Sequence, residues 1–241
     1  NTILDNDQPD WEYLYQNRIG QSNWQTFGLV ADGLFQSQEE IDAWPQQQFG
    51  EVKPGDIRYI DINGDGVVND YDKKPIGFPN VPEISYGFGA SVRYKGFDVS
   101  IFFQGVDNCN FFINNTFTQP FSATKNRHSN VFSDLYGNYW TENNRDAKYP
   151  RLSIGTNNNN NQTSTYWMVD GRYIRLKNAE IGYTLPKRIM SKAHIDRLRI
   201  YLSGMNLLTF SPFKLWDPDL QTGAANYPNN RVYNIGVTLV F

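Results

Sequence analysis

The strongest constraint in this sequence is a set of segments in which apolar and polar residues alternate. In residues 84–94 one parity carries Ile, Tyr, Phe, Ala, Val and Tyr, whereas the other carries only Ser, Gly and Arg. The pattern recurs in residues 97–104, 179–185, 198–203 and 233–241. Because successive side chains of a β-strand point to opposite faces, each segment predicts a strand with one apolar and one polar face.

Local details refine this prediction. The two-residue loop Lys95-Gly96 separates two alternating runs, so residues 84–106 are predicted to form one antiparallel hairpin. Phe102 is the one bulky residue on the polar face of that hairpin. Between residues 172 and 209 a second strand pair is predicted, and its apolar parity changes near Lys177 or Asn178, which indicates a β-bulge there.

The segments between the strands differ greatly in length. Residues 186–196 and the Lys95-Gly96 loop are short, whereas residues 1–83, 107–171 and 210–230 are long. If successive strands run in opposite directions, every long segment lies at one edge of the sheet and both short ones lie at the other. Outer-membrane barrels have this asymmetry, with short periplasmic turns and long external loops. We therefore predict an all-β fold: an antiparallel segment of a transmembrane β-barrel with long extracellular loops, a few short helices and a last strand over residues 231–241.

A soluble β-sandwich is the alternative, because it also shows a period of two. Two observations favour the barrel. Tyr and Phe lie near the ends of the apolar faces, as in the aromatic girdles of barrels, and loops of a sandwich are seldom so unequal in length. Within the first long region, residues 27–35 are predicted to be a strand, and Ser37 followed by Glu40 predicts a capped helix through Ala43.

Composition limits the class of protein further. The chain has 241 residues, a formal charge of -3 and a single cysteine, so it has too little charge asymmetry for a nucleic-acid binder and cannot form an intramolecular disulfide. No apolar run approaches the roughly 18–20 residues of a membrane-spanning helix. Mean hydropathy is -0.58 although 15% of residues are aromatic, a pairing that suits a barrel better than a disordered chain. The chain does not begin with Met, and we expect it to be part of a longer polypeptide.

One segment matches a calcium-binding loop. Residues 61–72 have the spacing of an EF-hand loop, with Asp72 where that loop carries Glu and with Gly66 at the sharp turn. The predicted calcium ligands are the side chains of Asp61, Asn63, Asp65, Asn69 and Asp72 and the carbonyl of Val67. The alternative is a turn rich in Asp and Asn that binds no metal, because these residues also favour turns without one. A site of this kind is expected to have a structural role.

No catalytic constellation is found in the sequence. His128 and His194 are the only histidines, and neither lies near a nucleophile motif or at metal-ligand spacing from the other. The long loops contain aromatic residues that could stack on sugars or peptides, although such residues more often pack loops together. The candidates for substrate binding are Trp140, Tyr166, Trp167 and Trp216.

Several motifs together resemble the C-terminal part of SusC/RagA-type TonB-dependent outer-membrane transporters. They occur in order over nearly the whole chain. They are Gly55-Asp56-Ile57-Arg58-Tyr59, Asp61-Ile62-Asn63-Gly64-Asp65-Gly66, Pro75-Ile76-Gly77, Tyr86-Gly87-Phe88-Gly89, Tyr94-Lys95-Gly96-Phe97-Asp98, Phe103-Gln104-Gly105, Tyr149-Pro150-Arg151-Leu152, Tyr173-Ile174-Arg175-Leu176-Lys177-Asn178, Gly182-Tyr183-Thr184-Leu185-Pro186, Gly204-Met205-Asn206-Leu207-Leu208-Thr209, Trp216-Asp217-Pro218-Asp219 and Val240-Phe241.

The resemblance implies a plugged barrel of about 22 strands, of which this chain would supply the last few. It also implies import of oligosaccharides or peptides in the outer membrane of a Bacteroidetes-like bacterium, without enzymatic activity. A SusD-like surface lipoprotein would lid the barrel, and the TonB, ExbB and ExbD complex would supply energy through an earlier part of the polypeptide. Outer-membrane lipid would surround the strands, and Phe241 resembles the signal read by the barrel-assembly machinery.

A rival interpretation comes from a different class of protein. A secreted, β-rich carbohydrate-binding or adhesion module could carry a dockerin-like calcium loop. That interpretation predicts a second calcium repeat, which the sequence lacks, and a chain that is soluble without detergent.

Overall fold

The computed structural model describes residues 2–5, 7, 13–113, 119–121, 131–190, 195–222 and 226–241. The chain divides into two compact units, each built from two stretches of sequence. The first, here called the loop unit, comprises Asn1–Val81 and Asn110–Asp170. The second, here called the sheet unit, comprises Pro82–Cys109 and Gly171–Phe241.

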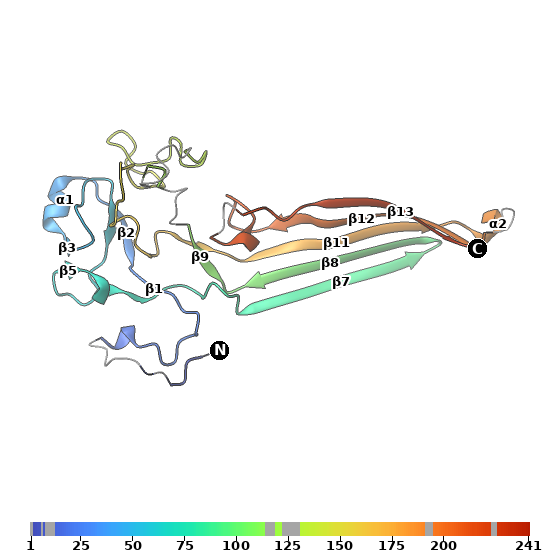
Figure 1. Ribbon diagram of the computed structural model, residues 1–241, viewed down its shortest axis with the longest axis horizontal. Helices are drawn as coiled ribbons and strands as arrows, with labels where there is room; N and C mark the ends of the chain where they lie inside the picture. The colour runs from blue at the N-terminus through green and yellow to red at the C-terminus, as the bar shows by residue number, and fades with distance from the viewer. Residues whose placement is uncertain are drawn as a thin grey trace. The chain divides into compact units, whose positions relative to one another are not determined.

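The sheet unit is a five-stranded antiparallel sheet with the strand order β13-β12-β11-β8-β7 (Figure 1). Its strands are β7 (Ile84–Tyr94), β8 (Phe97–Asp107), β11 (Tyr173–Thr184), β12 (Arg197–Phe210) and β13 (Val232–Val240). The sheet is open, with β7 and β13 at its edges. The predicted all-β antiparallel architecture is therefore confirmed. The connection after β11 contains the short helix α2 (Lys187–Met190), and the 3-10 helix η4 (Pro218–Leu220) follows β12.

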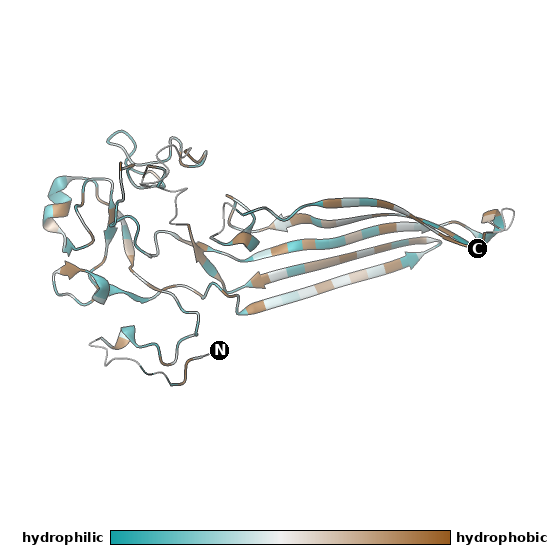
Figure 2. Ribbon diagram, in the orientation of Figure 1, coloured by the Kyte–Doolittle hydropathy of each residue, from teal (hydrophilic) through white to brown (hydrophobic). Residues whose placement is uncertain are grey.

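The strand register aligns apolar residues with apolar residues across the whole sheet. One row consists of Val92, Val99, Ile181, Leu202 and Ile235, whose exposed fractions lie between 42% and 76%. A neighbouring row on the opposite face consists of Ser91, Ser100, Glu180, Ser203 and Asn234. The alternation is visible along the long strands in Figure 2. The described residues of this unit leave the apolar strip exposed, which is typical of a surface that meets a partner or a lipid phase.

The predicted bulge is present between Leu176 and Asn178. Leu176 pairs with Phe103 and Asn178 with Phe102, so Lys177 is an extra residue relative to β8. On the other side, β12 carries the extra residue, and Asn206 there has a φ of 53°. Bulges increase the local twist of a strand and bend it, so this sheet is bent where all three central strands meet.

Glycines on the polar face make room for large side chains from the next strand. A Cβ on Gly87 or Gly89 would lie 2.9 or 3.2 Å from ring atoms of Phe102, so this ring lies across both glycines. Tyr201 covers Gly236 in the same way. The bulky Phe102 on the polar face is therefore accommodated by the absence of side chains opposite it, an arrangement that also pins strand register.

Two aromatic pairs lie on the apolar face. Phe97 and Tyr183 have ring centroids 4.5 Å apart at the end that carries the Lys95-Gly96 turn. Phe88 and Phe103 stack at 5.3 Å near the middle of β7 and β8. Aromatic residues at strand ends are typical of the interfacial girdles of barrels, and the Phe97–Tyr183 pair fits that pattern.

The loop unit contains short elements with a compact core. Its strands are β1 (Phe27–Gly28), β2 (Ala31–Leu34), β3 (Gln46–Gln47), β4 (Ile57–Tyr59), β5 (Val67–Val68), β6 (Lys74–Pro75), β9 (Asn110–Phe112) and β10 (Met168–Asp170). Its helices are η1 (Leu14–Gln16), α1 (Gln38–Ala43) and η2 (Asp70–Asp72). The sequence predicted one strand over residues 27–35, and the structure divides that stretch into β1 and β2. Buried side chains at the centre include Leu29, Phe35, Ile57, Tyr59, Tyr149 and Trp167.

Helix α1 begins where its capping residue predicted. The side chain of Ser37 accepts a hydrogen bond from the backbone N–H of Glu40 at 3.3 Å. The Glu40 carboxylate does not complete the reciprocal bond to Ser37. It accepts instead from the backbone N–H of Gln36 and pairs with Arg58. Among the described residues, no helix is long and apolar enough to cross a membrane.

Candidate functional site

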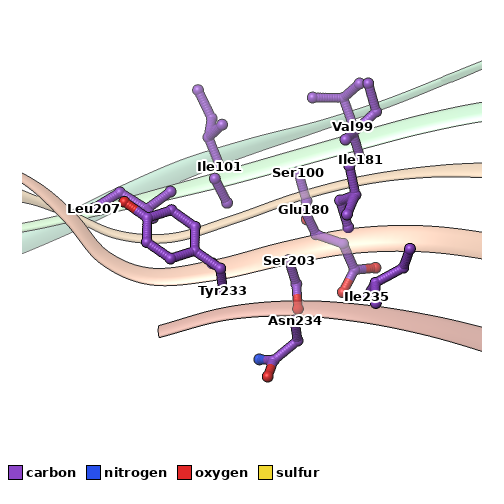
Figure 3. Close-up of a pocket in the computed structure, with 13 residues that line it drawn as sticks. Val99, Ser100, Ile101, Glu180, Ile181, Ser203, Leu207, Tyr233, Asn234 and Ile235 are labelled. Atoms are coloured by element: carbon purple, nitrogen blue, oxygen red, sulfur yellow. The ribbon is translucent and has the colours of Figure 1, made fainter. Parts of the chain in front are cut away.

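The sheet unit contains a hollow of about 600 Å³ lined by residues of β8, β11, β12 and β13 (Figure 3). In one row across these four strands, the paired residues are Ile101, Ala179, Gly204 and Tyr233. The hollow lies at the two small residues in the middle of this row. Most of its lining is apolar, and Glu180 is its single ionisable carboxylate. The lining therefore supplies one carboxylate without a second carboxylate or a histidine to form an acid-base pair.

The polar face of the sheet is organised around Arg199 of β12. Its guanidinium donates to Asp98 of β8 and, at 2.6 Å, to Glu180 of β11. The guanidinium covers Gly182 and lies 4.9 Å from the centroid of the Tyr201 ring. One arginine thus connects three neighbouring strands through charge-assisted hydrogen bonds, which are about twice as strong as neutral ones.

A second arginine, Arg175 of β11, holds the segment between β12 and β13. Arg175 is 1% exposed, its Nε donates to Thr209 at 3.0 Å, and its Nη atoms pair with Asp217 and Asp219. The Tyr173 hydroxyl also donates to Asp219. These ion pairs of Arg175 therefore tie the segment around η4 to the sheet.

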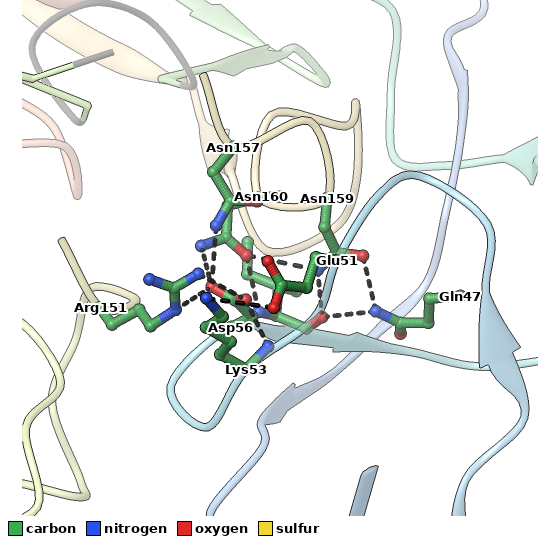
Figure 4. Close-up of polar contacts among 9 residues, drawn as sticks. Gln47, Glu51, Lys53, Asp56, Arg151, Asn157, Asn159 and Asn160 are labelled. Atoms are coloured by element: carbon green, nitrogen blue, oxygen red, sulfur yellow. Dashed lines mark hydrogen bonds and ion pairs between the residues drawn. The ribbon is translucent and has the colours of Figure 1, made fainter. Parts of the chain in front are cut away.

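The loop unit is held by a buried aspartate, Asp56 (Figure 4). Asp56 is 0% exposed, and its Oδ1 lies 2.8 Å from Arg151 Nε. The same oxygen accepts from the side-chain amides of Asn157 and Asn160, both at 2.9 Å. Its Oδ2 accepts from the backbone N–H of Lys53 at 2.8 Å and from Arg151 Nη2 at 3.0 Å. A fully buried carboxylate is tolerable here because both oxygens have several donors.

Side-chain amides also complete the hydrogen bonding of β4. The backbone N–H of Ile57 donates to Asn160 Oδ1, and the Ile57 carbonyl accepts from the amides of Gln47 and Asn159. The N–H of Tyr59 donates to Gln47 Oε1 at 2.6 Å. Because buried backbone groups must be paired, these amides act in place of a neighbouring strand.

The predicted calcium loop is ordered by its own side chains. Both carboxylate oxygens of Asp61 accept backbone N–H groups, from Gly64 at 2.7 Å and Gly66 at 2.8 Å. Asp72 is fully buried and accepts from Ile62 and Asn69, while Asp65 accepts from Val67. In the part of the chain that the structure describes, no three His, Cys, Asp or Glu side chains come together closely enough to hold a metal ion. Calcium binding by Asp61, Asn63, Asp65, Val67, Asn69 and Asp72 stays a prediction.

The aromatic residues predicted to bind substrate have packing partners. Trp140 and Trp167 are 8% and 1% exposed, and their indole N–H groups donate to Gln36 and to the Asn160 carbonyl. Tyr166 stands against Trp167 with ring centroids 5.1 Å apart. In the sheet unit, Trp216 packs on Phe213 and donates to the Gln221 carbonyl. Contact of these residues with a substrate stays a prediction.

The structure does not test the roles of the remaining residues named from the sequence. His128 and His194 lie outside the described residues. Phe241 follows β13 and is 83% exposed, and its role as an assembly signal stays a prediction. Asp56 and Arg175 are central residues that were not predicted from the sequence. They lie in the motifs of residues 55–59 and 173–178.

Three side chains of the loop unit, Asp134, Lys148 and Tyr149, form a hydrogen-bonded cluster. Asp134 Oδ2 accepts from Lys148 Nζ and from the Tyr149 hydroxyl, both at 2.6 Å. The bond from Lys148, followed by that from Tyr149, holds the pKa of Asp134 below its ordinary value. Burial, with the neighbouring Asp134, raises the pKa of Tyr149.

Comparison with known proteins identifies relatives over most of the chain. No protein-family model matches. The chain is 30% identical over 206 residues to TonB-dependent receptor P3 of Formosa agariphila, covering 80% of this chain and 20% of that protein. It is also 30% identical over 230 residues to TonB-dependent receptor P26 of the same species, covering 89% and 22%. The chain therefore spans about a fifth of the length of these relatives.

Solved structures share the fold. A structure of the RagAB peptide transporter superposes with a TM-score of 0.68 at 21% identity, covering 92% of this chain and 23% of that chain. The RagAB peptide importer in its closed-closed state gives 0.66 at 22% identity, with 92% and 23% covered. The open sheet is thus a partial barrel wall. The proteins and structures matched here are named as receptors and transporters.

We predict that Asp56→Ala will destabilise the loop unit by about 3 kcal/mol, because removal of one partner leaves a buried charge and amides unpaired. Hydrogen exchange of the full-length polypeptide should show lost protection over residues 53–57 and 151–161. The exposed Asp146→Ala is the matched control. Unchanged protection in Asp56→Ala would contradict a structural role for this aspartate.

Protonation of Asp134 is expected to weaken the same unit at low pH. Because the folded pKa of this carboxyl is lowered, its stabilising effect is present above the unfolded value of about 3.9 and is lost as pH falls toward the folded pKa. Asp134→Asn should remove this part of the pH dependence, whereas Glu142→Gln at an exposed site should keep it. Hydrogen exchange of residues 131–151, corrected for intrinsic rates, measures the effect, and identical profiles for the two variants would refute it.

Proposed function

Since the chain belongs to the SusC/RagA-type TonB-dependent receptors, we propose that it forms part of the barrel wall and the external loops of an outer-membrane importer. The observation that carries this proposal is the pair of adjacent rows in the sheet. An exposed apolar row containing Val99 and Ile181 faces lipid, and the polar row with Ser100 and Glu180 faces the lumen. One face of the sheet thus suits lipid and the other suits water, whereas a secreted module would not require a face that suits lipid.

The rest of the machinery lies in other parts of the importer. The transported substrate is an oligosaccharide or a peptide, and a SusD-like surface lipoprotein covers the external loops. Support for a peptide cargo comes from the solved structures that share the fold, which are named as a RagAB peptide transporter and a RagAB peptide importer. Energy comes from the TonB, ExbB and ExbD system through the remainder of the polypeptide. In this arrangement the loop unit and the segment after β12 are extracellular, and the connections at Lys95-Gly96 and α2 are periplasmic.

The wall assignment is tested with two arginine substitutions at adjacent positions of β8 in the full-length receptor. Val99→Arg places a charge in lipid and should destabilise the barrel by about 2–4 kcal/mol near the bilayer midplane. Ser100→Arg places the same charge on the lumen side and should leave assembly nearly unchanged. The amount of folded receptor in the outer-membrane fraction is measured, with nutrient uptake per folded receptor as a second readout. Equal losses for both variants would contradict the assigned faces.

A structural calcium ion in the loop of residues 61–72 is the second part of this proposal. The donors are all oxygens at the spacing of a calcium loop, and Asp61 and Asp72 already bring distant backbone groups of the loop together. Asp61, Asn63, Asp65, the Val67 carbonyl, Asn69 and Asp72 would hold the ion. The bound ion would stabilise a segment whose strand β5 is only two residues long and pairs with the equally short β3.

Calorimetric titration of the full-length receptor with calcium tests this part. Asp65→Ala removes a charged ligand and should therefore weaken calcium binding by tenfold or more. A tenfold loss corresponds to about 1.4 kcal/mol of binding free energy. Asp70→Ala is the matched control, because Asp70 is a neighbouring acidic residue, 80% exposed and paired with Lys73, outside the predicted ligand set. An absence of calcium binding in the unaltered receptor would end the calcium assignment and leave the importer assignment intact.

A further inference from the structure

The loop unit has a polar cavity that no comparison assigns to a ligand. Its volume is about 510 Å³, within the range of small-ligand pockets. It is lined by residues of two segments, 49–53 and 151–159. The lining combines the aromatic residue Phe49 with the charged residues Glu51, Lys53 and Arg151 and with Asn158. A cavity with one aromatic wall and several hydrogen-bonding groups is suited to a polar ligand.

Arg151 is the group in this cavity whose orientation is fixed. Its Nε and Nη2 atoms face Asp56, at 2.8 and 3.0 Å. Asp56 is fully buried and receives three further hydrogen bonds, from Lys53, Asn157 and Asn160, so the carboxylate and its surroundings are rigid. Within the described residues Nη1 of Arg151 has no hydrogen-bond partner, and the side chain is 22% exposed. A guanidinium held along one edge presents its remaining donors in a fixed direction.

The chemistry of those donors selects a carboxylate. Planar N–H groups in a fixed arrangement match the two oxygens of a carboxylate better than a single neutral acceptor. Lys53 at the rim is half exposed and lies 3.2 Å from Glu51, so it can exchange this surface pair for a ligand at little cost. The Asn158 side chain is exposed and belongs to the same lining. Because Asp56 balances Arg151, recognition here depends on directed donors and not on net charge.

From this geometry we infer that the cavity between residues 49–53 and 151–159 is a binding subsite for a carboxylate-bearing ligand, with Arg151 as the recognition residue. The inference rests on the proposed function, since it assigns acidic groups to the substrate that the importer admits. A peptide carboxylate and a uronic acid of a glycan share this chemistry.

The test uses the full-length receptor in detergent and isothermal titration calorimetry with four probes. Trigalacturonic acid and its methyl ester form one pair, and N-acetyl-tetraalanine with a free or an amidated C-terminus forms the other. Arg151→Lys keeps a positive charge beside Asp56 but removes the planar donor arrangement. Asn158→Trp fills the cavity without altering Asp56 or its donors. Asn143→Trp, at an exposed site of the same unit outside the cavity, is the matched control.

At least one acidic probe is expected to bind, and its uncharged counterpart should bind about tenfold more weakly or worse, as for a lost charge-assisted hydrogen bond. Arg151→Lys and Asn158→Trp should each weaken the acidic probe by a similar factor, and Asn143→Trp should not. The probe that binds identifies the source of the carboxylate. If hydrogen exchange shows that the loop unit of Arg151→Lys has lost protection, the inference is judged from the binding of Asn158→Trp alone.

The inference is overturned if neither acidic probe binds, if the neutral forms bind equally well, or if Asn158→Trp binds as the unaltered receptor does. Nutrient uptake is measured separately in cells. A receptor that imports nutrient but fails these binding tests retains the proposed function and loses the subsite. A receptor that passes the binding tests but supports no uptake retains the subsite and loses the proposed function.

Discussion

Backbone pairing in register is the constraint on which the sheet unit depends. In a lipid phase every backbone polar group must be satisfied within the protein, and antiparallel strands achieve this by pairing on both sides. Once the pairing is set, a shift by one residue would move every side chain to the opposite face. The rows through Val99 and through Ser100 are the direct result of one register maintained over five strands. The bulge at Lys177 changes the parity once and at one level of the sheet.

The loop unit solves the same pairing problem by different means. Its strands are two to four residues long, so they leave most backbone groups without a neighbouring strand. Asn159, Asn160 and Gln47 supply those partners for β4, and Asp56 organises the asparagines around it. Side-chain amides suit this role because each carries both donors and acceptors. The run of asparagines from residue 157 to 161 therefore contributes structure where low-complexity composition alone would indicate an irregular loop.

The sheet was predictable from the sequence, and the polar clusters were not. Alternation is local information, so residues 84–94 and 97–104 show their strands, their faces and even the exceptional Phe102 without reference to the rest of the chain. The contact between Asp56 and Asn160 joins residues 104 positions apart, and no periodicity links them. The same holds for Arg175 and Asp217, which are 42 positions apart. The burial of Trp167 could not be read from the sequence either, because its hydrogen bond to the Asn160 carbonyl follows no periodic pattern.

The two arginine-centred clusters of the sheet unit and the Asp56 cluster follow one physical rule. In each, a charge is removed from water only where several directed partners replace the solvent, as for Arg175 with Thr209, Asp217 and Asp219. Such clusters add less net stability than an apolar core of equal size, but they fix geometry more strictly because a misplaced partner leaves a charge unpaired. The loop unit combines such a cluster with an apolar core that includes Leu29, Ile57 and Trp167, so the Asp56 cluster fixes the position of the loops in addition to that core. A charged group can take part in such a cluster and still tolerate water at its outer edge, as Arg151 does with Nε and Nη2 toward Asp56 and its other edge toward the cavity.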